Sequence, residues 1–297
     1  MIVQPLRSLP DMPVVTRFAP SPTGGLHLGH VYSAWFAQSQ ARAAGGRYLV
    51  RIEDIDATRC RPEFERAILD DLAWLGLASD GPVRRQSDHM AEYAAALARL
   101  DGAGLIYPCF CTRADIRAEI ERAGGAPQGP DGLIYPGICR RLGPAARADR
   151  VAAGASHALR LDMAAACRVT GSLHWHDRSA GSIEATPAAF GDVVLARKET
   201  PTSYHLAVTV DDAIQGVTLV TRGLDLFAAT HIHRLLQALL DLPVPDYHHH
   251  ALRTDAAGAR LAKRAGAETI AALRAAGHDA AAIRGMAGIT DEARAAP

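Results

Sequence analysis

Alternating stretches of apolar and polar residues near the N-terminus predict the first three elements of the fold. Residues 14–18 and 48–52 are apolar enough to form buried strands, and residues 28–44 carry apolar side chains at helical spacing. A pair of glycines then ends the helix. A strand, a helix and a second strand in this order predict a βαβ unit with parallel strands.

The pattern farther along the chain predicts an α/β protein. Gly and Pro residues are frequent in residues 107–144, which we expect to form a loop-rich insertion. The Ala-rich tail from residue 265 is expected to be helical, with breaks at Gly277 and Gly285. Elsewhere we expect helices at 63–77, 89–105 and 224–242, and strands at 157–161, 172–176, 190–195 and 203–210.

Composition narrows the class of protein without naming a function. The chain has 297 residues, 48% of them hydrophobic, and a formal net charge of zero. It shows no signal peptide and no run near the ~20 apolar residues of a membrane span, so we expect a cytoplasmic protein without a membrane partner. A local arginine cluster could still bind nucleic acid or be an ordinary solvated surface: Arg140, Arg141, Arg147 and Arg150.

The segment from Arg17 to His30, RFAPSPTGGLHLGH, is the most informative stretch. Its prolines and glycines turn the chain between the first strand and the helix, whose first N–H groups can bind a phosphate. His27 and His30 are three residues apart and can face the same side. By itself this pattern could also be a turn with two surface histidines. Glu53 follows the second strand, at the sheet edge where ligands bind.

The complete segment resembles the first signature of class I aminoacyl-tRNA synthetases of the glutamyl and glutaminyl branch. Three further segments are similar to that family: RIED around Glu53, SYHLAVTVDD around Tyr204 and TRGLD around Arg222. The resemblance runs from Val14 to about Arg264. It implies a Rossmann-like catalytic domain with a parallel sheet that activates an amino acid with ATP.

The family resemblance also assigns residues to the substrates. A carboxylate suits the ammonium group of glutamate, and an arginine fork suits its carboxylates. Accordingly Glu53 would bind the ammonium and Arg222 one carboxylate, beside Tyr204; the rest of the glutamate pocket would be Arg17, Phe18, Ala19, Pro20 and Ser21. ATP, with Mg²⁺, would bind His27, Gly29, His30 and Lys263.

Ordinary structural interpretations of three of these residues remain open. Arg17 could pair with a neighbouring acid such as Asp54. Tyr204 could be a half-buried strand tyrosine, and Arg222 a surface residue before a helix. The order of the segments and their flanking residues favour the functional interpretation.

The third family signature, a loop with two lysines and a serine, is altered here to Arg260-Leu-Ala-Lys263. Lys263 takes the place of the second lysine, Arg260 replaces the first, and Ala262 lacks the serine hydroxyl. One lost hydrogen bond costs about 0.5–1.5 kcal/mol, so we expect activity to survive. A non-catalytic RNA-binding relative is the alternative.

Three of the five cysteines, Cys109, Cys111 and Cys139, lie in one short region. Such a cluster fits a metal site better than a disulfide framework, and three thiolates could fill three corners of a tetrahedral zinc site. Tyr135 is the fourth ligand by resemblance to a short glutamyl-synthetase paralogue only. We expect one structural Zn²⁺ per chain; buried thiols without metal are the alternative. Successive strand residues face opposite ways, so residues 248–250 are a poor metal site.

The family comparison implies a particular reaction. Only 33 residues follow Arg264, so we expect no anticodon-binding domain. The short chain is similar to the glutamyl-Q tRNA(Asp) synthetase family, whose members attach L-glutamate to queuosine at the wobble position of tRNA(Asp). Alternatives are charging of the acceptor end of tRNA(Glu) and a more distant nucleotidyltransferase. We expect a monomer.

The motifs also divide the chain. We expect the Rossmann-like catalytic domain in two halves, residues 13–106 and 188–255. An inserted zinc-binding subdomain would occupy residues 107–187, and the lysine loop with a short helical tail residues 256–297.

Lys263→Ala is expected to lower the rate of adenylate formation by more than about tenfold, because this lysine would meet charge that develops on the phosphates. Glutamate-dependent exchange of pyrophosphate into ATP measures this rate. An unchanged kcat would contradict the assignment of Lys263 to the ATP site.

Overall fold

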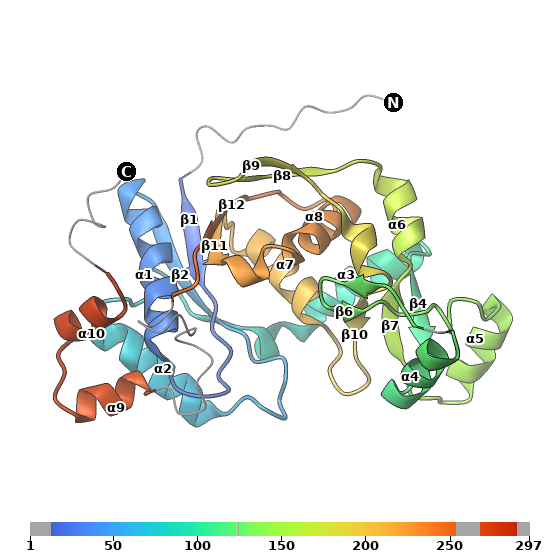
Figure 1. The fold of residues 1–297 in the computed structure, drawn as a ribbon, viewed down its shortest axis with the longest axis horizontal. Helices are drawn as coiled ribbons and strands as arrows, with labels where there is room; N and C mark the ends of the chain where they lie inside the picture. Colours follow the sequence, from blue (N-terminus) through green and yellow to red (C-terminus); the bar gives the residue numbers. More distant parts are fainter. Residues whose placement is uncertain (1–12, 124, 254–267, 290–297) are drawn as a thin grey trace.

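The predicted βαβ unit is confirmed at the N-terminal end of the molecule (Figure 1). The computed structural model describes residues 13–123, 125–253 and 268–289. Strand β1 (Val15–Phe18), helix α1 (Leu28–Ala43) and strand β2 (Arg47–Ile52) follow in order, and β2 lies parallel to both β1 and β3 (Arg84–Arg85). A side chain at Gly46 would bring its Cβ to 1.9 Å from the carbonyl oxygen of Val14, so the turn into β2 requires glycine.

A second set of parallel strands continues this sheet. Strand β11 (Leu219–Gly223) is parallel to β12 (Asp246–His250), which is parallel to β8 (His174–Asp177); β9 (Gly181–Glu184) completes the order as a hairpin with β8. Val15 and Thr218 join the two sets, because the Thr218 N–H donates to the Val15 carbonyl at 3.0 Å. The carboxyl ends of β1, β2 and β11 therefore open toward one region.

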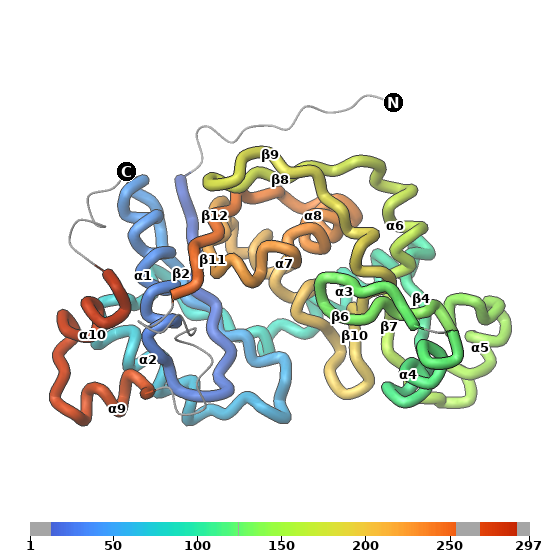
Figure 2. Tube along the Cα trace, in the orientation of Figure 1, coloured from blue at the N-terminus to red at the C-terminus, as the bar shows by residue number. Residues whose placement is uncertain are grey.

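Two large hydrophobic clusters form most of the core. In the first, α1 and α2 (Pro62–Trp74) pack against β2 and against the C-terminal helices α9 (Ile270–Ala275) and α10 (Ala280–Met286). Figure 2 shows these chain ends side by side, red against blue. The second cluster joins helices α3 (Met90–Gly102), α6 (Met163–Thr170), α7 (Tyr204–Ile214) and α8 (Ala229–Leu239).

A small antiparallel sheet and two helices of the predicted insertion lie at the end of the molecule opposite α1 and α2 (Figure 1). The sheet has the order β10 (Val194–Ala196), β7 (Ala158–Leu161), β4 (Ile106–Cys109). Beside it lie α4 (Arg113–Arg122), α5 (Pro144–Ala152) and the hairpin β5 (Gln128–Gly129) to β6 (Gly132–Leu133). Strands β8 and β9 belong to the predicted insertion by sequence, but β8 pairs with β12 and β9 with β8, so both lie in the sheet of β11 and β12. The proposed domain boundaries stay predictions.

The strand predicted at 203–210 is wrong, because these residues belong to helix α7. The Ser203 hydroxyl accepts from the N–H of Leu206 and caps the helix. Residues 206–212 are all buried, and a segment buried on every side loses the apolar–polar period that separates a helix from a strand.

Three smaller expectations also need correction. The insertion is not loop-rich throughout, because Thr112 and Asp115 form a reciprocal cap that starts α4. The strand predicted at 190–195 is a 3₁₀ turn, Pro187–Phe190, followed by the shorter β10. Gly277 does break the tail, with a φ of +92°, but Gly285 lies within α10.

The helices expected at 63–77, 89–105 and 224–242 correspond to α2, α3 and α8, with 3₁₀ turns at Gln86–His89 and Leu224–Leu226 before the last two. The strands expected at 157–161 and 172–176 correspond to β7 and β8. None of the helices in the described residues is both long and apolar enough to cross a membrane.

Candidate active site

A cavity of about 780 Å³ opens at the carboxyl ends of β1, β2 and β11, beside the start of α1. Its volume lies within the usual range of small-molecule sites. It brings together all the predicted substrate residues that the structure describes, whereas Lys263, Arg260 and Ala262 lie outside the described residues. The predicted residues that line it are Arg17, Phe18, Ala19, Pro20, Ser21, His27, Gly29, His30, Glu53, Tyr204 and Arg222.

The two histidines of the turn stack on each other at the start of α1. Their ring centroids are 3.6 Å apart, and the backbone N–H of His27 donates to His30 Nδ1 at 3.4 Å. Burial and the neighbouring His27 lower the pKa of His30 to about 3, and burial also lowers the pKa of His27. Both rings are therefore neutral at pH 7. The buried His27 Nδ1 has no hydrogen-bond partner among the described residues.

Arg17 is held by an acid that the sequence analysis did not assign. Its guanidinium donates to both carboxylate oxygens of Asp212 in α7, at 2.9 and 3.3 Å. Asp54, the partner considered from the sequence, instead accepts from the N–H and hydroxyl of Ser87. Asp212 is the last residue of the family segment SYHLAVTVDD. Its pairing with Arg17 could not be read from the sequence, because the two residues are 195 positions apart.

Arg51 joins the same ionic cluster from the neighbouring strand β2. Its side chain is 0% exposed and contacts Asp212 at 2.7 Å, Glu53 at 3.1 Å and Asp211 at 3.6 Å. Burial raises the pKa of Asp212, but the charges of Arg17 and Arg51 outweigh it and hold that pKa below its usual range. These contacts fix Glu53 at the cavity wall.

Glu53 keeps only one ion pair, with Arg51, within the described residues. Burial raises the pKa of its carboxyl group, and the charges of Arg51 and Arg17 only partly oppose this. A cationic group in the cavity would therefore stabilise the Glu53 carboxylate.

Tyr204 and Arg222 occupy different elements from those considered in the structural interpretations above. Tyr204 is the first residue of helix α7, and Arg222 lies in strand β11, 6% exposed. The Arg222 Nη1 and the Tyr204 hydroxyl are 3.5 Å apart. No carboxylate of the described residues forms an ion pair with Arg222.

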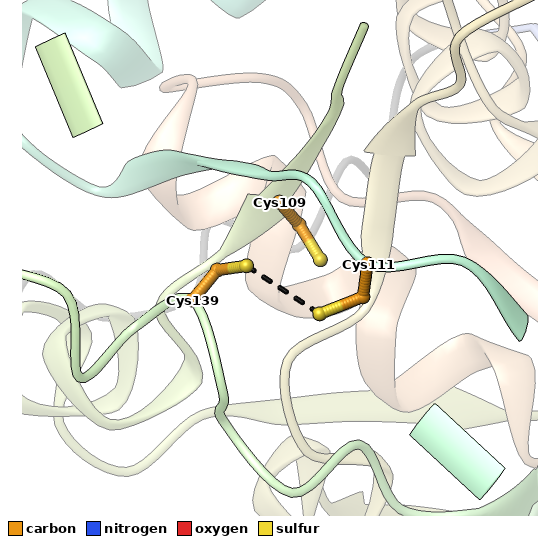
Figure 3. Close-up of side chains that lie close together, drawn as sticks. All are labelled: Cys109, Cys111 and Cys139. Carbon is orange, nitrogen blue, oxygen red and sulfur yellow. Dashed lines mark hydrogen bonds between the residues drawn. The ribbon is translucent and has the colours of Figure 1, made fainter. Parts of the chain in front are cut away.

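The three cysteines of the insertion point toward one another, although they come from separate segments (Figure 3). Their sulfurs lie within 4.8 Å of one another. The Tyr135 hydroxyl is 3.4 Å from the Sγ of Cys109 and 3.5 Å from that of Cys111, and it accepts from the N–H of Cys139 at 2.8 Å. In tetrahedral zinc sites Zn–S bonds of about 2.3 Å place the sulfurs at similar separations, so this donor set fits zinc.

A cation beside the cluster complements negative ligands. The Arg160 guanidinium carbon lies 3.9 Å from the centre of the Tyr135 ring. Burial raises the pKa of Cys109, but hydrogen bonds with Tyr135 and Arg160 lower it by more, so the net pKa is below its usual value. Burial raises the pKa of Cys111 to about 12. Within the described residues no other group of metal-binding side chains lies as close together.

The histidine run at 248–250 faces two ways, as expected for a strand. His248 and His250 pack against the ring of Phe36, with centroids at 4.8 and 5.2 Å. His249 points to the other face and contacts Asp177. The three side chains therefore do not converge on one point.

The arginine cluster is largely occupied within the protein. Arg140 pairs with Asp192 and Arg141 with Glu119. The other two stack on aromatic rings, Arg147 over Tyr107 and Arg150 over Phe110. The side chains of Arg140 and Arg141 are still 42% and 60% exposed, so these contacts are compatible with both interpretations of the cluster.

Comparison with known proteins agrees with the geometry of the cavity. The family described as tRNA synthetases class I (E and Q), catalytic domain, matches residues 13–289. The chain belongs to this family. Within it, a glutamyl-Q tRNA(Asp) synthetase of Rhodobacter capsulatus is 53% identical over 93% of this chain and 100% of the relative, and one of Leptothrix cholodnii is 44% identical over 92% and 90%.

Solved class I synthetase structures show a similar fold. A glutamate tRNA ligase from Elizabethkingia meningosepticum, crystallised with its amino acid, superposes with a TM-score of 0.70 at 28% identity. The match covers 81% of this chain and 50% of the ligase, so the chain spans about half the length of that protein. A glutamate-tRNA synthetase from Elizabethkingia anophelis gives a TM-score of 0.72 at 27% identity, over 82% of this chain and 51% of that one.

Glu53→Gln is expected to raise the thermal stability of this synthetase at pH 7. The pKa of Glu53 is higher in the folded state than in the unfolded state, so its ionisation destabilises the fold at high pH. Gln removes this cost. The gain over the wild type should shrink as the pH falls through the folded-state pKa, and vanish below the unfolded value.

Thermal unfolding of both proteins from pH 7 to pH 4 measures the difference. Asp54→Asn is the control, since Asp54 is hydrogen-bonded to Ser87 outside the cavity. A Glu53→Gln protein less stable than the wild type at pH 7 contradicts the assignment.

Proposed function

We propose that this chain activates L-glutamate with ATP and transfers the glutamate to queuosine at the wobble position of tRNA(Asp). The observation that carries the substrate assignment is one cavity with a carboxylate, Glu53, and a buried arginine without an acid partner among the described residues, Arg222. Glutamate presents an ammonium to the first and a side-chain carboxylate to the second. The acceptor follows the names of the similar relatives.

The ion pairs already present distinguish the arginines of the cavity as candidates for binding the substrate carboxylate. Arg17 lines the cavity but is paired with Asp212, so it shapes the pocket and stabilises Glu53 through the cluster. Arg253 lies over the ring of Tyr32, toward the start of α1. Arg222 is therefore the cation proposed for the side-chain carboxylate, with Tyr204 beside it.

ATP is proposed to lie along the start of α1. The helix N-terminus supplies partial positive charge, and its first turn contains no acidic residue. His27 and His30 are neutral, so they serve ATP as hydrogen-bond partners rather than as charges. Mg²⁺ bound with ATP and Lys263 are proposed to supply the full positive charges that face the phosphates.

The reaction then has two steps. An oxygen of the glutamate α-carboxylate attacks the α-phosphorus of ATP, and pyrophosphate leaves with the electrons of the broken P–O bond. A hydroxyl of the queuosine cyclopentenediol next attacks the carbonyl carbon of the glutamyl-adenylate, loses its proton, and AMP leaves. The cyclopentenediol resembles the ribose diol that other synthetases acylate. Splayed bases of single-stranded loops are common targets of specific RNA recognition.

We also propose that Cys109, Cys111, Tyr135 and Cys139 bind one structural Zn²⁺. When bound, the ion would link the end of β4 to the segment after β6. None of the four ligands lines the cavity, so the ion is proposed to have a structural role. Arg160 would offset the negative charge of the ligands.

The function is tested by incubating the protein with ATP, labelled glutamate and tRNA(Asp), with and without queuosine. Label should enter only the queuosine-containing tRNA. Label on tRNA(Glu) would replace the proposed acceptor with an acceptor-end activity, and no label and no adenylate would indicate a non-catalytic relative.

Cys109→Ser is expected to release one zinc per chain and to loosen residues 107–140, because thiolate ligands hold the metal. Elemental analysis and hydrogen exchange measure the two effects, with Cys167→Ser, outside the cluster, as the control. A wild-type protein purified without metal would overturn the zinc proposal.

A further inference from the structure

Arg222 is surrounded by neutral hydrogen-bond acceptors on three sides. Its Nε donates to His249 Nε2 at 3.1 Å, and its Nη2 donates to the Thr230 hydroxyl at 2.7 Å. Its Nη1 lies 3.2 Å from His233 Nδ1. All three partners are buried. We call Thr230, His233 and His249 the Arg222 cradle.

The first arm of the cradle ends at a carboxylate. An arginine can only donate, so His249 Nε2 must be unprotonated and the ring proton must lie on Nδ1. That nitrogen is 2.7 Å from Oδ2 of Asp177, which also accepts from the His249 backbone N–H. Asp177 therefore selects the tautomer that can accept from Arg222.

In the second arm, too, each group donates a hydrogen bond to the next one outward from Arg222. His233 accepts from Arg222 at Nδ1, so its proton lies on Nε2, 3.2 Å from His205 Nδ1. His205 then carries its proton on Nε2, which is 3.5 Å from the carboxylate of Asp131. Both arms thus place imidazole rings between Arg222 and an acid.

The other arginines of the cavity region show why this matters. Arg17 and Arg51 contact carboxylates directly, at 2.9 and 2.7 Å, which compensates their charge. Arg222 is also held by several hydrogen bonds, but these come from uncharged groups and do not compensate its positive charge. Burial lowers the pKa of His233 well below its usual value, and burial with the Arg222 charge lowers that of His249 to about 4, so both rings stay neutral at pH 7.

We propose that Thr230, His233 and His249 are positioning residues that hold the Arg222 guanidinium at the cavity wall and, as neutral acceptors, leave its charge for a substrate carboxylate. The inference rests on the proposed binding of the glutamate side chain by Arg222. It adds that selectivity for an acidic substrate depends on residues that do not line the cavity themselves.

Two variants of the full chain test the cradle by glutamate-dependent ATP–pyrophosphate exchange in the presence of tRNA(Asp). His249→Phe keeps a ring that packs on Trp175 and Phe227 but removes the hydrogen bonds of the imidazole, including the one from Arg222. Thr230→Val nearly keeps the side-chain shape and removes the hydroxyl that contacts Arg222 and His249. His248→Phe is the matched control, because His248 is the neighbouring strand residue and faces Phe36.

Both cradle variants should raise the glutamate KM, His249→Phe by about tenfold or more, as expected for lost hydrogen bonds to a charged group. The ATP KM, the kcat and inhibition by glutamine, which lacks the side-chain carboxylate, should not change. The control should match the wild type.

A rise in the ATP KM equal to that in the glutamate KM, or a glutamate KM unchanged in both variants, would overturn the inference. Should His249→Phe fail to fold, Thr230→Val decides alone. An active wild type with unaffected variants refutes only the cradle, whereas a wild type that forms no glutamyl-adenylate refutes the proposed function and the cradle with it.

Discussion

The buried ionic cluster around Arg51 is the interaction on which the cavity depends. Arg51 comes from β2, while its partners Asp211 and Asp212 come from α7, 161 residues away for the Arg51–Asp212 hydrogen bond. A buried charge without its partner costs several kcal/mol, so the two halves of the chain can pack only with these pairs formed. The same contacts fix Arg17 and Glu53 at the cavity wall, which couples packing of the fold directly to the shape of the site.

Charge is distributed unevenly among the buried arginines, and in the proposed function this unevenness is the source of selectivity for an acidic substrate. Arg17 and Arg51 are compensated by direct ion pairs, whereas Arg222 contacts two hydroxyls and two imidazoles among the described residues. A buried cation is stable only with a compensating charge nearby. In the proposed reaction the substrate supplies that charge, so binding free energy depends on an acidic side chain.

The cysteine cluster stabilises a different part of the molecule by a different means. Few residues of α4 and α5 are buried, so hydrophobic packing alone gives this end of the fold little support. Cys109, Cys111, Tyr135 and Cys139 gather at its centre, where a bound ion would replace part of a hydrophobic core. The cluster and the cavity share no residues.

Local sequence by itself determined the βαβ unit, the turn with His27 and His30, and the place of Glu53 after β2, because each depends on residues near one another in the chain. It also singled out Arg222 through a family segment and the cysteines through their clustering in one short region. Only the tertiary structure decided that residues 204–214 form a helix, since burial on every side hides its period. It alone decided the partners of Arg17 and Arg222, because these contacts join strands and helices far apart in sequence and leave no pattern along the chain.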